Sequence, residues 1–366
     1  MIEHIIWFIV GLVALIAGAD FIVRGASRVA EYFNIPKLII ALTVVAFGTS
    51  APELAVSIQA GIDGQTDLML GNIIGSNISN ILLILGLSAL IIPLKVHANL
   101  IKIDVPVMIG ITVLVYLFAL SGQIYFWQCA VLSILLIVYL VFLARQSGKT
   151  TLKEKPSKRK KSVRQLVFNI ILGVVGLILL IYGAQWLIDS AIVFAEMAGV
   201  SELVIGLTVV AVGTSLPEIS TALVAAVKNE RDIAVGSVIG SNILNLLAVL
   251  GVSGLFIPGS IPVQDALLRF DLLILIAVSV ACIPIFFTGH KISRWEGATF
   301  FGFYVAYFTF LFLASAEHDV LELFSNTMLL FVIPIVTLTI TTVAIREWQK
   351  RQRFKGFGKG KKSKKE

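Results

Sequence analysis

The sequence predicts an all-α polytopic membrane protein, built from two inverted-topology five-helix repeats that form a ten-helix core, plus one extra C-terminal transmembrane helix. Three observations support this fold class. The 366-residue chain is 58% hydrophobic and only 14% charged, which is a membrane-protein composition. It contains eleven apolar stretches of the length that crosses a bilayer as a helix. Its two halves are related by an ungapped internal repeat.

The apolar stretches lie at about residues 5–26, 37–62, 67–92, 100–121, 124–144, 166–194, 202–227, 232–257, 268–288, 296–315 and 327–346. Two polar, basic segments interrupt this series. We therefore expect five regions: a first repeat (1–144), a basic cytoplasmic linker (145–164), a second inverted repeat (165–315), an additional transmembrane helix (316–346) and a basic cytoplasmic tail (347–366).

The internal repeat has an offset of 165 residues, the difference between Gly48 and Gly213. Residues 48–53 (GTSAPE) recur at 213–218 (GTSLPE), and residues 75–80 (GSNISN) recur at 240–245 (GSNILN). A repeat of this size in a membrane protein indicates a transporter built from two halves. Glycines four residues apart, at 71 and 75 and again at 236 and 240, predict close approach of helix backbones.

The distribution of Lys and Arg predicts the orientation of the chain in the membrane. The odd-numbered loops are basic, whereas Arg269 is the exception on the even-numbered side. The basic positions of the odd loops are Arg24, Arg28, Lys37, Lys95, Lys102, Lys228, Arg231, Lys291, Arg294 and the linker. Odd loops and tail are therefore expected in the cytoplasm of a cell-membrane protein, with the N-terminus outside. Since each half has five helices, the second half enters the membrane upside down.

The second apolar stretch contains a carboxylate that needs an explanation. A Glu at the centre of a membrane helix costs about 2.5–3.5 kcal/mol, so Glu53 is a functional-site hypothesis. Pro52 has no N–H for the carbonyl of Gly48, and a residue before proline, here Ala51, is disfavoured in α geometry. The helix should break here and leave Glu53 in the first turn of a half-helix. Thr49 and Ser50 precede Glu53 by four and three residues, so the segment indicates an oxygen-lined cation site.

Other polar residues receive a structural interpretation. Asp20 should pair with Arg24 on the next helical turn. Asp104, Asp189 and Asp271 lie near predicted helix ends, where a carboxylate reaches the interface at little cost.

Cys129 and Cys282 fall within apolar stretches, where we expect small packing residues rather than a disulfide. No His/Cys spacing typical of zinc sites is present, and the net charge of +7 is explained by topology rather than by nucleic-acid binding. We therefore expect neither a cofactor nor a nucleic-acid partner.

The two GTS-x-PE segments and the two GSN segments closely resemble the alpha repeats of the cation/calcium antiporter superfamily, and most nearly those of prokaryotic sodium/calcium exchangers. The resemblance covers residues 5–315. It implies a ten-helix exchanger core in which the second, third, seventh and eighth helices bind ions at mid-membrane. It also implies that the first and sixth helices slide across this bundle to switch access.

Carried over position by position, the resemblance implies a metal site shared by calcium and sodium. Its implied members are Glu53 and Glu218 as central ligands; Thr49 and Thr214 at the calcium position; Ser50, Ser76, Ser215, Ser241 and the carbonyls of Ala46 and Ala211 at flanking sodium positions; and Asn80 and Asn245 facing the middle. Some relatives have an aspartate where this chain has Asn245. The amide argues against potassium dependence.

The sequence thus predicts a secondary active transporter, not an enzyme, that exchanges calcium for sodium by alternating access. Its expected partners are the two ions and membrane lipid; oligomeric state is not predicted. A proton/calcium antiporter of the same fold is the main alternative. An intramembrane hydrolase would need a Ser–His or Asp–Asp pair at membrane depth, and the histidines lie at helix ends. A channel suits an inverted pair of acids less well than alternating access does.

Overall fold

The structure is a computed structural model that describes residues 2–151, 162–197, 213–315, 320–343 and 345. The first half contains α1 (Ile2–Phe33), α2 (Lys37–Ile40), η1 (Ala41–Val45), α3 (Ala46–Thr49), α4 (Ala51–Ile62), α5 (Thr66–Ser79), η2 (Asn80–Leu85), α6 (Gly86–Ile91), η3 (Leu100–Asp104), α7 (Val105–Ala119) and α8 (Phe126–Thr151), where η marks π-helical turns. The second half contains α9 (Val163–Met197), α12 (Leu216–Val227), α13 (Arg231–Leu244), η5 (Asn245–Leu250), α14 (Gly251–Gly254), η6 (Leu267–Asp271), α15 (Leu272–Phe287) and α16 (Arg294–Ser315).

The membrane-spanning segments agree with the predicted series. Among the described residues, nine helices are long and apolar enough to cross a membrane, and the bent pair Lys37–Thr49 and Ala51–Ile62 makes a tenth. Of the seventh predicted span, α12 is described, whereas residues 202–212 lie outside the described part. The last span covers Val320–Val343, beginning with α17 (Val320–Thr327) and η7 (Met328–Val332). It lies within the region predicted for the additional helix (316–346) and begins seven residues before the apolar stretch that was expected from about 327.

Two pairs of short strands mark the two faces of the molecule. β1 (Leu94–Lys95) pairs antiparallel with β4 (Lys291–Ile292), and β2 (Gln123–Tyr125) pairs antiparallel with β3 (Ser260–Pro262). The span made of η3 and α7 separates β1 from β2, so the two pairs lie at opposite faces. We call the face with β1 and β4 the odd face, because it joins the third and ninth loops. The face with β2 and β3 is the even face.

These pairings confirm the inverted topology. The repeat offset carries β1 onto residues 259–260, which overlap β3, although β1 and β3 lie on opposite faces. Side-chain contacts agree with this assignment. At the odd face, Lys37 of the first loop forms an ion pair with Glu230 of the seventh, with Nζ and Oε1 2.8 Å apart. At the even face, Gln264 Nε2 donates to Asp67 Oδ2 at 2.6 Å.

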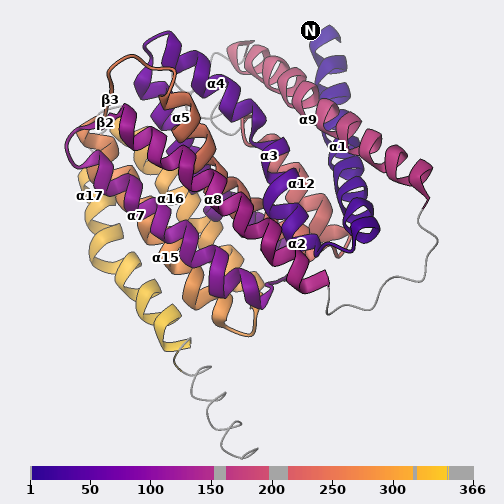
Figure 1. Cartoon of the computed structure of the whole chain (residues 1–366). Coiled ribbons are helices and arrows are strands. Elements are labelled where there is room, and N and C mark those ends of the chain that lie inside the picture. The colour runs from indigo at the N-terminus through magenta and orange to yellow at the C-terminus, as the bar shows by residue number, and fades with distance from the viewer. Residues whose placement is uncertain (1, 152–161, 198–212, 316–319, 344, 346–366) are drawn as a thin grey trace, which may run out of the picture.

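The first and sixth spans, α1 and α9, lie against each other at the side of the molecule away from the last span (Figure 1). Glycines line the seam between them. A Cβ on Gly18 would lie 2.7 Å from the carbonyl oxygen of Gly176, and one on Gly11 would lie 2.8 Å from that of Gly183. Gly18, which follows Gly11 in α1, therefore contacts the earlier of the two glycines in α9, so the two helices are antiparallel. Larger side chains would force the backbones apart.

The centre of the bundle is formed by the spans that carry the GSN segments. Every residue in the most apolar window of the span Arg231–Gly254 is buried, and 83% are buried in that of Thr66–Ile91, whereas none is in Val320–Val343. Cys129 and Cys282 are free and buried, as predicted. Both motif-bearing spans are thus shielded from lipid, which is a requirement for a polar site at this depth.

The intramembrane aspartates differ in part from the prediction. Asp20 pairs with Arg24 as predicted, at 2.7 Å, and also contacts Lys228. Asp104 does not reach an interface: it is buried and accepts a hydrogen bond from the hydroxyl of Tyr139 at 3.3 Å. Snorkelling was therefore the wrong interpretation for Asp104, because α8 provides a phenol partner that a single helix does not reveal.

Candidate cation-binding site

The site begins with the break in the second span. Ser50 leaves helical geometry, with φ −83° and ψ 4°, and the two half-helices meet at a bend of 45°. Pro52 occupies the first turn of α4, where a backbone N–H is not needed, and Glu53 follows it in that turn. The non-helical residue was predicted to be Ala51, which was wrong by one position. A break at Ser50 is sufficient to place Pro52 at a tolerated position.

The second half repeats this break with the same geometry. Ser215 has φ −90° and ψ 3°, α12 begins at Leu216, and Pro217 and Glu218 lie in its first turn. Both glutamates therefore lie at the positive end of a half-helix dipole, where an anion is favoured. Since the halves are inverted, the two half-helices approach the middle of the protein from opposite faces.

The two breaks contact each other across the repeat interface. The hydroxyl of Ser50 donates to Oε1 of Glu218 at 3.4 Å. The hydroxyl oxygens of Thr49 and Ser241 lie 3.5 Å apart, and Thr49 also donates to the carbonyl of Ala46 at 3.3 Å. These distances are at the long limit for O–H···O hydrogen bonds. The two breaks thus bring carboxylate and hydroxyl oxygens of both halves into one place.

Two buried carboxylates distinguish this cluster from the single unpartnered hydroxyls and amides found elsewhere in the described helices. Glu53 is 1% and Glu218 4% exposed, and Oε2 of each has no hydrogen-bond partner among the described residues. The same holds for the hydroxyl of Ser215 and for both amide atoms of Asn80 and Asn245. A buried polar atom left without a partner costs about 1–3 kcal/mol. A hard cation with 6–8 oxygen ligands matches the chemistry of these carboxylate, hydroxyl and amide oxygens.

Of the other predicted members, Ser76 and Ser241 are buried, and Thr214 is only partly buried. Ala211 lies outside the described residues. Asn80 and Asn245 each start a π-helical stretch, η2 and η5, at equivalent repeat positions. Short π segments within α-helices frequently occur at functional sites.

Close packing of small residues brings the eighth span to the break. A Cβ on Gly240 would lie 2.8 Å from Cα of Leu42 and 2.9 Å from Cβ of Ala46, and one on Gly236 would lie 2.9 Å from Cβ of Ala41. The predicted close approach is therefore confirmed for Gly236 and Gly240. For Gly71 and Gly75 no described atom lies within 4 Å, and the segment equivalent to η1 falls outside the described residues.

Two buried hydroxyls close to the glutamates were missed in the sequence. Ser57 and Thr221 lie four and three residues after Glu53 and Glu218, and both are fully buried. Ser57 accepts a hydrogen bond from Asn72 Nδ2 at 3.1 Å, and this amide also contacts the carbonyl of Glu53 at 3.4 Å. Thr221 has no partner for its hydroxyl within the described part of the chain. Their helical spacing from the acids was a usable signal.

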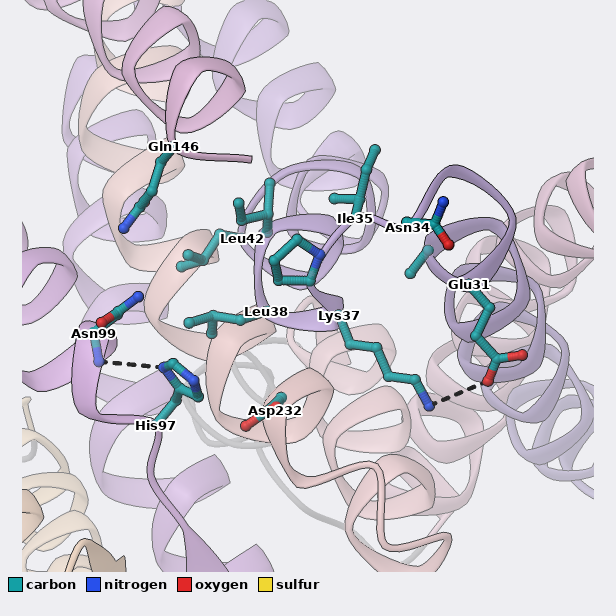
Figure 2. A pocket seen from close by; sticks show the side chains of 13 residues that line it. Glu31, Asn34, Ile35, Lys37, Leu38, Leu42, His97, Asn99, Gln146 and Asp232 are labelled. Carbon is teal, nitrogen blue, oxygen red and sulfur yellow. Dashed lines mark hydrogen bonds and ion pairs between the residues drawn. The ribbon is translucent and has the colours of Figure 1, made fainter. Parts of the chain in front are cut away.

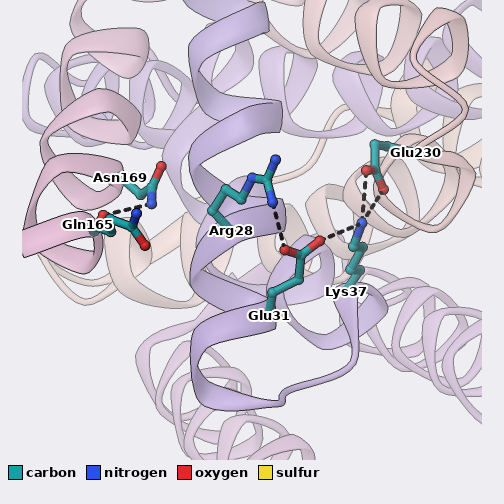
Figure 3. A network of polar contacts seen from close by, with 6 residues as sticks. All are labelled: Arg28, Glu31, Lys37, Gln165, Asn169 and Glu230. Carbon is teal, nitrogen blue, oxygen red and sulfur yellow. Dashed lines mark hydrogen bonds and ion pairs between the residues drawn. The ribbon is translucent and has the colours of Figure 1, made fainter. Parts of the chain in front are cut away.

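A cavity of about 370 Å³ lies at the odd face, beside the start of the second span (Figure 2). Its walls include Lys37, His97 and Asp232, and its deepest member on the second span, Leu42, lies four residues before Ala46. Beside it runs a chain of ion pairs (Figure 3). Arg28 contacts Glu31 at 3.0 Å, and Lys37 contacts both Glu31, at 3.7 Å, and Glu230. The ion pairs link α1 to the second span and to the loop before α13.

The chain belongs to the sodium/calcium exchanger protein family, whose sequence model matches residues 3–145 and 168–313. It is 34% identical to the sodium/calcium exchanger MaX1 of Methanosarcina acetivorans over 344 residues, covering 83% of this chain and 97% of that protein. It is 40% identical to the putative antiporter CaxA of Alkalimonas amylolytica over 271 residues, covering 73% and 85% of the two chains.

Solved structures of the sodium-calcium exchanger NCX_Mj match the fold with a TM-score of 0.72 and 34% identity, over 83% of this chain and 97% of that one. The chain is therefore an antiporter-family membrane protein with the exchanger fold. The matched family region ends at residue 313, before the last span.

Proposed function

We propose that this protein exchanges calcium for sodium across the cell membrane by alternating access, with Glu53 and Glu218 as ligands shared by both ions. One observation carries the proposal: two buried carboxylates, one from each inverted half, each have an oxygen without a hydrogen-bond partner among the described residues. An acid at this depth is expensive unless a cation compensates it. Membership of the exchanger family supports the same conclusion.

The neutral oxygens around the acids divide between the two ions in this proposal. Calcium takes Glu53, Glu218 and the hydroxyls of Thr49 and Thr214. Sodium takes the flanking positions, formed by Ser50, Ser76, Ser215, Ser241 and the carbonyls of Ala46 and Ala211. Asn80 and Asn245 face the middle. Contacts between the halves, Ser50 with Glu218 and Thr49 with Ser241, support a single shared site.

Charge balance explains why the exchange is coupled. Two glutamates neutralise one calcium ion or two sodium ions, so a loaded site is near neutral and its conformational change moves little net charge. A site without cations carries two unpaired carboxylates in a region of low dielectric, where each costs several kcal/mol to bury, by the order-of-magnitude estimate for real proteins. The unloaded protein therefore switches slowly, and one ion leaves only when the other replaces it.

Sodium rather than protons is the proposed counter-ion. Asn80 and Asn245 are amides, which do not take up a proton near neutral pH. The hydroxyls around the acids supply the neutral oxygens that sodium needs. A proton/calcium antiporter would use the same two glutamates as proton carriers, and it remains the competing outcome of the test.

The proposed orientation places the odd face in the cytoplasm. The odd-face contacts bring together loops that carry Lys37, Lys95, Lys228 and Lys291, and short basic loops remain on the cytoplasmic side. The linker 145–164 and the tail 347–366 would then be cytoplasmic and the N-terminus external. Labelling of Lys158→Cys in intact cells by a membrane-impermeant maleimide should fail, while Gly64→Cys is labelled. The reverse pattern would overturn this orientation.

Calcium flux in proteoliposomes tests the proposed function. Vesicles containing the purified protein are loaded with sodium, potassium or choline, and calcium uptake is measured with and without a separately imposed proton gradient. We expect calcium uptake only into the vesicles that are loaded with sodium. Uptake driven by the proton gradient without sodium would establish the proton antiporter instead, and uncoupled calcium entry would indicate a channel.

A further inference from the structure

An apolar groove of about 600 Å³ lies between the exchanger core and the last span. Its walls are Leu82 of η2 together with α15, α16 and the helix Val320–Val343; Figure 1 shows these three helices beside each other in orange and yellow. Small residues widen it: Ala277 and Ala281 lie four apart on one face of α15, and Ala306 faces them from α16. The groove arises because the last span does not pack closely against the core.

The groove is long enough for an acyl chain that enters from the even face. It begins at Arg269, at the even-face end of the ninth span, and reaches Ala281 on that helix and Ile340 on the last span. A rise of about 1.5 Å per residue gives roughly 18 Å between Arg269 and Ala281 and roughly 24 Å between Phe324 and Ile340. The groove therefore extends beyond the middle of a hydrocarbon core about 30 Å thick. Its length and apolar lining can hold an acyl chain.

The mouth of the groove carries a positive charge at the level of lipid headgroups. Arg269 is the exception to the distribution of Lys and Arg, because it lies on the even side, whose loops carry no other Lys or Arg. It contacts Asp265 at 3.5 Å, but both side chains are largely exposed, and such a pair contributes little. A guanidinium has five N–H donors, which leaves it able to bind a phosphate. Below it, Phe270 stacks on Phe310 with ring centroids 4.0 Å apart.

We propose that a phospholipid of the even-face leaflet binds here, with one acyl chain in the groove and its phosphate on Arg269. The combination of charge and apolar depth identifies the occupant: a second protein helix would fill the groove but would not need a cation at its mouth. This site is separate from the candidate cation site and does not depend on which ions are exchanged.

The test compares lipid retention in two variants and a matched control. Ala277→Phe fills the groove, and Arg269→Gln removes the phosphate partner. Val280→Phe makes the same change as the first variant on the same helix, at an exposed position that does not line the groove. Native mass spectrometry of the detergent-purified full chain counts bound phospholipid, and delipidated protein is then titrated with phosphatidylglycerol and with diacylglycerol of the same chains.

We expect wild type and Val280→Phe each to retain one more bound phospholipid per chain than Ala277→Phe retains. Arg269→Gln should weaken phosphatidylglycerol binding about tenfold, the effect of about 1.4 kcal/mol, and leave diacylglycerol binding unchanged. If Ala277→Phe does not fold, Ala281→Leu replaces it. Equal retention by all variants would overturn the proposal, as would a wild-type dimer that Ala277→Phe alone dissociates, since a second copy would then occupy the groove.

Discussion

Neutralising either buried glutamate while keeping its shape is the sharpest test of the candidate site. In Glu53→Gln and Glu218→Gln the side-chain volume hardly changes, so packing should be retained. Each substitution removes one of the two formal charges that would face the cation. Since Oε2 of each glutamate has no partner in the described part of the protein, no neighbouring donor is orphaned there by the change.

The expected loss of calcium affinity follows from the burial of the two glutamates. With the glutamates 1% and 4% exposed, solvent does not screen the lost charge. Removing one member of a buried ion pair costs about 3–5 kcal/mol. At about 1.4 kcal/mol per tenfold change, calcium binding should weaken by roughly 10²–10³-fold or more. In calcium-free, sodium-free buffer, by contrast, the variants should be as stable as wild type or more so, because one of two unpaired carboxylates is gone.

Calcium titration of thermal unfolding measures both effects on the purified protein. A ligand at about 100 times its dissociation constant stabilises the native state by about 2.7 kcal/mol, so wild type should show a clear rise in Tm that the variants lack. Asp104→Asn is the matched control, because Asp104 is also a buried intramembrane acid but hydrogen-bonds to Tyr139. Its amide oxygen can still accept the hydrogen bond from Tyr139, and the variant should keep the calcium response of wild type. A calcium affinity within threefold of wild type in either Glu variant would refute the site.

Three further results are expected. Gly18→Ala should lower Tm, because its Cβ would lie 2.7 Å from a backbone oxygen of Gly176 and such overpacking costs about 1–3 kcal/mol. The control Gly110→Ala, which has no described atom within 4 Å of its Cβ, should be neutral or stabilising. Equal effects of the two substitutions would contradict close packing between α1 and α9. Deleting residues 321–366 should reduce membrane yield more than turnover per folded molecule in proteoliposomes, and loss of exchange by a well-folded truncation would show that the last span is part of the ion path. Asn245→Asp adds a third carboxylate and should make calcium uptake more dependent on pH, an effect that pH-jump flux measurements would detect or exclude.

The sequence predicted the fold well because its signals are local or repeated. Apolar length identified the spans, Pro52 and Pro217 identified the helix breaks, and the 165-residue offset with the loop charges implied inversion. The errors came where a neighbouring span decides the outcome. Asp104 is buried and hydrogen-bonds to Tyr139 of a neighbouring span, which the sequence around Asp104 does not reveal.

The candidate site was predictable as a set of residues but not as a set of contacts. Nothing local to residues 48–53 shows that Ser50 reaches across to Glu218, or that Thr49 meets Ser241, because both contacts join halves of the chain that lie far apart in sequence. The burial of Ser57 and Thr221 likewise depends on the neighbouring spans. Tertiary packing alone decides which of many membrane hydroxyls face the acids.

The inverted repeat gives this site a property that neither half has alone. One half contributes Glu53 and the other Glu218, and each carboxylate lies in the first turn of a half-helix that enters from the opposite face. In the proposed site, each face would therefore meet one carboxylate in the first turn of one half-helix. With amides at Asn80 and Asn245, the formal charge of the candidate set stays at two from either side. A site with this symmetry can release the same ion to both faces without rebuilding its ligands, which is what alternating access requires.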